Sequence, residues 1–156
     1  MARIAYEKPP IFDEAAKLFG VTDKDVIFYS YGDTIFSPTG KMPSDDLLIH
    51  EGMHAEQQAH DSGTAKLWWQ RYFIDPEWRI EQEAEAFGAQ LQWLKRRVKD
   101  RNAIARYVHQ MAASLSSQMY GKAISYQDAT KKIKAYADGS VIDEIEKHID
   151  DNGEPD

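Results

Sequence analysis

From Ser44 to near the C-terminus, most segments of the chain carry a helix start signal or an apolar repeat of helical spacing. The clearest start is Asp75-Pro76, where an N-cap residue precedes a proline at the first helical position. The helix that it opens carries an apolar stripe: Ile80, Ala84, Phe87, Leu91, Leu94 and Val98. Ser125 and Ser140 each precede an acidic residue three positions later, as in a capping box. The sequence therefore predicts a mostly helical body.

Strand signals are confined to the N-terminal quarter of the chain. Residues 26–31 are rich in β-branched and aromatic residues, and a second short run of this kind follows at 34–36. This pattern predicts a β-hairpin or two neighbouring strands, with a short helix before them at 11–19. The expected fold class is α+β: a mostly helical domain with a small β-hairpin or sheet. We expect a single domain over residues 1–149 and a flexible tail at 150–156.

The composition of the chain argues against some classes of function. Among the 156 residues, 26 are acidic and 19 are basic, and the net charge is −7. This balance argues against a general binder of nucleic-acid phosphates, which needs a basic face. No segment has the about 18 uninterrupted apolar residues of a membrane span, and the N-terminus lacks the apolar region of a signal peptide. We therefore expect a cytoplasmic protein that binds neither nucleic acid nor membranes; the sequence predicts no oligomeric state.

The motif with the most specific chemistry is His-Glu-Gly-Met-His at residues 50–54. On a helix His50 and His54 lie on one face, about one turn apart, so both imidazoles can bind one Zn²⁺. Glu51 lies beside them and is expected to contact a metal-bound water rather than the metal, as in zincins. The chain has no cysteine, so any further ligand must be a histidine or a carboxylate. The alternative is a chance match on a polar helix face.

One candidate for the third ligand is His60. Its spacing from His54 is that of metzincins, but Gln57 stands where those proteins have the glycine that turns the chain back toward the metal. On an uninterrupted helix His60 would lie roughly 9 Å along the axis from His54, and it could not share the ion.

The other candidates are glutamates of the helix that begins near residue 76, as in gluzincins. Glu77, Glu81 and Glu85 recur every four residues and form a like-charge row, typical of a solvated or rim surface. Glu83 instead lies at the edge of the apolar stripe, where a carboxylate without a partner is costly and a metal would supply the missing charge. Glu81 keeps one argument in its favour, because Glu85 follows it at a spacing found in some gluzincins. The ranking is Glu83, then Glu81, then His60.

Several segments together resemble a family of small phage- and prophage-encoded zinc metallopeptidases. The segments that carry this resemblance are residues 31–38, 50–54 with Gln57 and Gln58, 69–72, 75–79, 82–86 and 120–125. In that family the glutamate that follows a glutamine is constant, which implies Glu83 as the third ligand of a gluzincin-like zinc site. The chain departs from the family at Phe87, where histidine or tyrosine is common. The resemblance implies no particular substrate.

The function expected from these observations is zinc-dependent hydrolysis of peptide bonds, with Glu51 as general base and a peptide or protein as substrate. Zincins often bind extended peptides along a sheet edge, so the strand near Ile35 is a candidate platform. The tryptophans at 68, 69, 78 and 93 are expected mainly in the core, and less so in the wall of a cleft. The alternative function is a non-enzymatic phage interaction protein, or a regulatory protein, that retains a structural zinc site.

Overall fold

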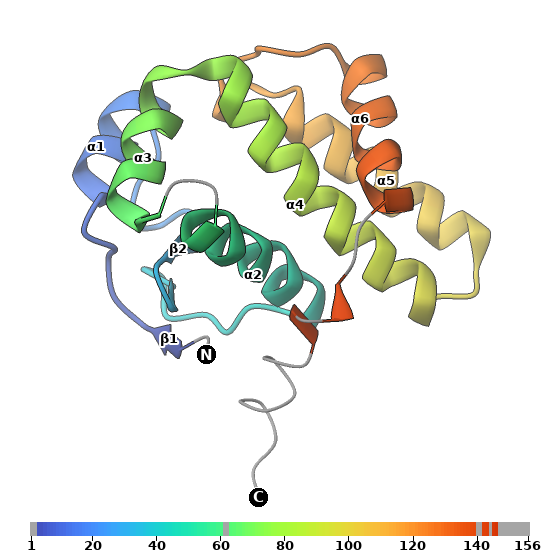
Figure 1. Cartoon of the computed structure of the whole chain (residues 1–156), viewed down its shortest axis with the longest axis horizontal. Helices are drawn as coiled ribbons and strands as arrows, with labels where there is room; N and C mark the ends of the chain where they lie inside the picture. Colours follow the sequence, from blue (N-terminus) through green and yellow to red (C-terminus); the bar gives the residue numbers. More distant parts are fainter. Residues whose placement is uncertain (1–2, 61–62, 140–141, 144, 147–156) are drawn as a thin grey trace, which may run out of the picture.

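The computed structural model describes residues 3–60, 63–139, 142–143 and 145–146 (Figure 1). The strands are β1 (Arg3–Ala5), β2 (Tyr29–Tyr31) and β3 (Thr34–Phe36). The helices are α1 (Phe12–Phe19), α2 (Asp45–His60), α3 (Ala65–Ile74), α4 (Pro76–Arg97), α5 (Arg101–Leu115), the short 3₁₀ helix η1 (Gln118–Tyr120) and α6 (Tyr126–Gly139). The α+β class and the mostly helical body are confirmed. The predicted helix start at Ser140 and the tail at 150–156 lie outside the described residues.

The helix starts follow the local signals closely. The Asp75 side chain accepts a hydrogen bond from the Trp78 backbone N–H at 3.1 Å, directly before Pro76 opens α4. Ser125 Oγ accepts from the Asp128 N–H at 3.1 Å and caps α6. These caps satisfy backbone donors that have no partner within the helix, which explains why short polar residues mark both boundaries.

The three strands form one small sheet in the order β1-β3-β2. The expected hairpin is present: β2 and β3 are antiparallel and turn at Gly32, whose φ of 63° suits a residue without a Cβ. β1 was not predicted, and it pairs in parallel with β3, with Ile4 opposite Ile35. The proposed peptide platform at Ile35 is therefore wrong, because both edges of β3 are occupied by neighbouring strands.

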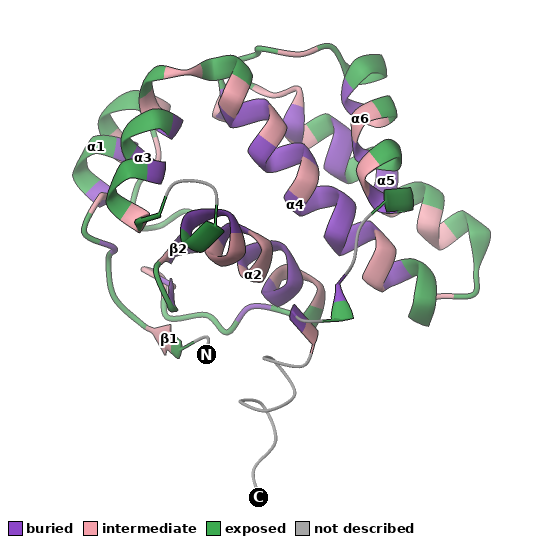
Figure 2. Cartoon of the chain, viewed as in Figure 1, coloured by how far each residue is buried: buried purple, intermediate pink, exposed green. Residues whose placement is uncertain are grey.

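α4 is the central helix of the described chain. Its apolar stripe packs against α5 and α6, and buried residues run along most of its length (Figure 2). Gly88 allows a close approach of α6, since a Cβ at this position would lie 2.5 Å from Tyr136 Cβ. On its other side α4 meets α2, and the two helices carry the predicted ligand residues.

A second, aromatic core lies between α1, β2 and α3. Its buried members are Phe12, Ala15, Tyr29, Trp68, Trp69 and Tyr72. Two of the four tryptophans are thus fully or nearly fully buried here, as expected. Within the described ranges, no helix combines the length and the apolar character that crossing a bilayer would require.

Candidate metal centre

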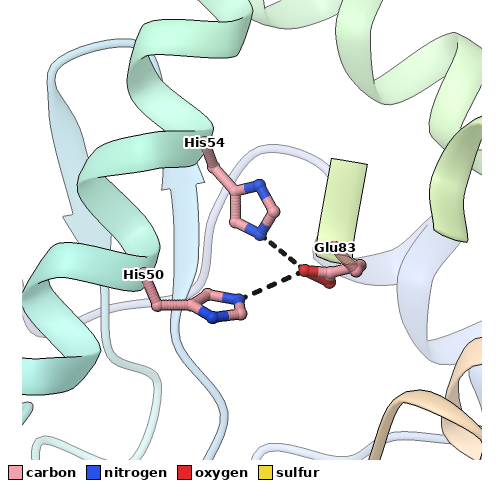
Figure 3. A group of neighbouring side chains, drawn as sticks. All are labelled: His50, His54 and Glu83. Atoms are coloured by element: carbon pink, nitrogen blue, oxygen red, sulfur yellow. Dashed lines mark hydrogen bonds and ion pairs between the residues drawn. The ribbon is translucent and has the colours of Figure 1, made fainter. Parts of the chain in front are cut away.

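Three predicted side chains converge where α2 crosses α4 (Figure 3). His50 Nε2 lies 3.2 Å and His54 Nε2 lies 2.6 Å from the same carboxylate oxygen, Glu83 Oε1. The three residues are 5%, 6% and 3% exposed, so water cannot screen their charges. Neighbouring ligands of a tetrahedral zinc lie roughly 3.3 Å apart, so His50 and Glu83 already have a suitable separation. Glu83 would withdraw from His54 by roughly 0.7 Å to admit the ion.

Packing fixes the orientation of both imidazole rings. The His50 ring lies edge-on to Phe87, with 4.5 Å between ring centroids, and the His54 ring lies 5.1 Å from Trp68. Behind the motif, α2 lies close to the segment near Ile145, because a Cβ on Gly52 would come within 2.7 Å of Ile145 Cγ2. The glycine inside the motif therefore has a packing role that the sequence did not indicate.

A glutamine amide orients each histidine from behind. Gln57 Oε1 lies 2.8 Å from His54 Nδ1, and Gln57 Nε2 donates to the Gln82 carbonyl and to Glu85. Since both partners of this amide nitrogen are acceptors, the amide oxygen must face His54, and His54 Nδ1 must be the donor.

His50 is oriented in the same way by Gln90. Gln90 Oε1 lies 3.1 Å from His50 Nδ1, while Gln90 Nε2 donates to the Asp46 carboxylate at 2.7 Å. Both rings are consequently held with Nδ1–H outward and Nε2 toward Glu83. If both imidazoles were neutral, two nitrogen lone pairs and a carboxylate would face one another. This arrangement needs a proton or a cation between these groups.

The charged forms of His54 and Glu83 stabilise each other. Burial opposes ionisation of His54, but Glu83 outweighs it and raises the pKa of His54 to about 9. Burial likewise disfavours the Glu83 carboxylate, but His54 and His50 hold the pKa of Glu83 well below its usual range. Tyr72 adds a hydrogen bond to Glu83 Oε2 at 3.1 Å. Without a metal the site contains a buried imidazolium–carboxylate pair, and a divalent cation can replace the shared proton.

Glu51 lies beside the three residues and has a different partner. Ser30 Oγ lies 2.8 Å from Glu51 Oε2 and 2.7 Å from the Glu51 carbonyl, so this hydroxyl ties β2 to α2. Burial raises the pKa of the Glu51 carboxyl, although the two histidines and the Ser30 hydrogen bond oppose the shift. A buried carboxylate with a raised pKa is suited to accepting and returning a proton.

The other two ligand candidates lie elsewhere. His60 is exposed at the end of α2 and forms an ion pair with Glu56 at 3.0 Å, because the helix continues through Gln57 as expected without a glycine. Glu81 interacts with Lys132 and Tyr136 of α6.

The row formed by Glu77, Glu81 and Glu85 is fully exposed only at its first member. Glu77 is exposed, but Glu81 is only partly exposed and is bound by α6, and Glu85 accepts a hydrogen bond from Gln57. These contacts come from residues far along the chain, so the four-residue spacing alone did not reveal them.

A cavity of about 60 Å³ adjoins the predicted ligands and Glu51. Tyr72, Met119 and Tyr120 line it, together with Ser30. Burial raises the pKa of Tyr72 and Tyr120 well above the usual value, so both hydroxyls stay protonated. No sequence pattern predicted that these side chains share a cavity with the metal ligands. Trp68 and Trp69 both belong to the aromatic core and line this cavity. They therefore have both of the roles expected for the tryptophans, in the core and in the wall of a cleft.

Comparisons of the chain with protein-family models, with curated proteins and with solved structures find no match. Two imidazole nitrogens and one carboxylate oxygen are a ligand set that suits Zn²⁺, and the buried carboxylate supplies the charge that such an ion needs.

Proposed function

We propose that this chain is a zinc-dependent peptidase of gluzincin type, in which His50, His54 and Glu83 bind the metal and Glu51 is the general base. The observation that carries the proposal is the convergence of Glu83, from a separate helix, on the Nε2 atoms of both motif histidines. When bound, zinc would polarise the substrate carbonyl and acidify a water molecule. The resemblance to phage and prophage metallopeptidases supports the same ligand set, and a zincin-like fold and a cytoplasmic location belong to this proposal.

The residues around the site have separate roles in this scheme. Glu51 would accept a proton from the attacking water and return it to the leaving amine, and Ser30 orients its carboxylate. The Tyr72 hydroxyl donates a hydrogen bond to Glu83 and so orients its carboxylate. Tyr120 lines the same cavity, and its protonated hydroxyl interacts with Glu83.

A non-enzymatic protein with a structural zinc is the alternative. Structural zinc sites are commonly closed by a fourth protein ligand, whereas catalytic sites keep one position for water. Among the described residues, the group that could bind a metal here has three members, and Glu51 is engaged by Ser30. This arrangement favours an open catalytic site.

The proposed function is tested by measuring first the zinc content of the protein and then its hydrolysis of peptides. Protein purified without chelator should contain about one zinc per chain, and His50→Ala should contain none. The zinc-loaded protein should cleave at least one member of a fluorescence-quenched peptide library, with loss of cleavage on chelation and recovery with Zn²⁺. Zinc bound without any cleavage across the library would favour the structural alternative, and absence of zinc would reject both functions.

A further inference from the structure

The outer edge of β2 adjoins the site, and two of its backbone groups are already engaged. The Ser30 carbonyl accepts hydrogen bonds from Gln58 Nε2 and from Trp69 Nε1, both at 2.8 Å. The Gly32 N–H donates to Gln58 Oε1 at 2.8 Å. A peptide that joined this edge as a strand would need these same backbone groups. These contacts oppose strand addition at the edge nearest Glu51, so recognition needs another feature of the site.

The cavity beside the metal ligands provides that feature. Many of the residues that line it are apolar, among them Phe19, Val21, Ile27, Phe28, Trp69 and Met119. Its polar groups include those of Glu51 and the metal ligands. A bound molecule must therefore place a polar, reacting group beside a small apolar one.

The size of the cavity restricts that apolar group. An apolar cavity of about 150 Å³ admits benzene, whereas this one measures about 60 Å³, part of which the metal and its water would take. The space suits a branched aliphatic group of a few carbon atoms and excludes an aromatic ring. Because closely packed walls resist expansion, an oversized group cannot be accommodated without displacing side chains.

We propose that this site selects substrates by a compact aliphatic group, from methyl to isopropyl, next to the reacting carbonyl. This inference rests on the proposed function, since it requires a zinc that ligands can reach from the cavity. Burying each additional carbon should strengthen binding roughly four-fold until the cavity is full.

Simple hydroxamic acids test the inference by binding rather than by turnover. Acetohydroxamate, isobutyrohydroxamate and benzohydroxamate share one zinc-binding group and differ in the attached group. With zinc-loaded protein, titration calorimetry should show isobutyrohydroxamate, which has two more carbon atoms, binding roughly 16-fold more tightly than acetohydroxamate. Benzohydroxamate should bind more weakly than isobutyrohydroxamate by at least the same factor.

Two variants with an enlarged cavity and one matched control variant complete the test. Phe19→Ala and Met119→Ala each remove a wall, so either folded variant should gain affinity for benzohydroxamate. Phe73→Ala removes a ring from the same aromatic cluster, 6.2 Å from the Phe19 ring, but Phe73 does not line the cavity. It should keep the preference of the parent protein.

The outcomes separate this inference from the proposed function. Equal or tighter binding of benzohydroxamate to the parent protein would overturn the size selection and leave the zinc site standing. If zinc is bound but acetohydroxamate is not, the metal is not accessible from the cavity, and both proposals fail. If no zinc is bound, the proposed function fails first, and the inference fails with it.

Discussion

Gln57 Oε1 lies 2.8 Å from His54 Nδ1, and the amide nitrogen of Gln57 is bound by two acceptors on α4. This residue therefore sets both the tautomer and the direction of a metal ligand, from a position three residues further along the same helix. Gln90 performs the same role for His50 from the facing helix.

Replacing Gln57 should weaken zinc binding without abolishing it. Gln57→Ala removes the acceptor of the His54 Nδ1–H, so we expect the zinc affinity to fall roughly 10- to 100-fold. Competition with a fluorescent chelator measures this change. Gln70→Ala is the control, since it removes the same group from an exposed position of α3 and should not change the affinity. Unchanged affinity in Gln57→Ala would show that packing alone orients His54.

The identity of the third ligand can be tested with three single substitutions. Glu83→Gln removes the negative charge that faces both Nε2 atoms, and it should release zinc at micromolar metal concentrations. Glu81→Gln and His60→Ala should retain one zinc per chain, because those side chains face α6 and solvent. Metal analysis after gel filtration gives the result. Retention of zinc by Glu83→Gln, or its loss from Glu81→Gln, would reject the assignment.

Glu51→Gln should separate metal binding from catalysis. The amide keeps the size of the side chain and can keep the contact to Ser30, but it cannot accept a proton. We expect full zinc content, unchanged thermal stability within a few degrees, and a fall in kcat of roughly 10²- to 10⁴-fold. Glu56→Gln, on the same helix and paired with His60, should keep full activity. Loss of zinc from Glu51→Gln would make Glu51 a ligand instead.

The Glu81 contacts should give the metal-free protein a specific pH dependence. Burial raises the pKa of Glu81, but Lys132 and Tyr136 outweigh this effect and lower that pKa below its usual value. A depressed pKa stabilises the fold above the unfolded pKa, and this contribution is lost as the pH falls through the folded pKa. Glu81→Gln should therefore destabilise the protein at pH 6–7, and the difference should shrink below about pH 4.5.

The size of that effect should be small, because the Glu81 side chain is 40% exposed. We expect a difference in the free energy of unfolding below about 1 kcal/mol, measured by urea denaturation between pH 3 and pH 7. Glu77→Gln, at an exposed position of the same helix, is the matched control. A constant difference across this pH range would contradict the proposed role of the contacts.

The contact between α4 and α6 should not tolerate a methyl group at Gly88. The added Cβ would lie 2.5 Å from Tyr136 Cβ and 2.9 Å from the Ala137 backbone nitrogen, so α6 would have to move. We expect Gly88→Ala to reduce the free energy of unfolding by about 1–3 kcal/mol in chemical denaturation. Gly139→Ala introduces the same methyl group on α6 where no heavy atom lies within 4 Å, and it should not destabilise the protein. Equal stabilities of the two variants would show that α6 adjusts freely.

Local sequence determined the helices and the ligand-bearing segments. Asp75-Pro76 and Ser125 mark the helix starts because capping needs only neighbouring residues. The spacing of His50 and His54 placed them on one face, since helical geometry is independent of the rest of the chain. Glu83 could be favoured because its apolar neighbours predicted burial, and burial of a carboxylate requires a partner.

Only the tertiary structure decided which groups surround these residues. β1 was not predicted because its pairing with β3 joins segments about thirty residues apart, and no local pattern specifies a partner strand. Ser30 lies 21 residues from Glu51, and Gln90 lies 40 residues from His50. Periodicity indicates which side of a helix is buried, but the crossing of α2 and α4 selects the side chains that meet there. The ligand candidates were therefore determined by sequence, and the hydrogen bonds that orient them were determined by the fold.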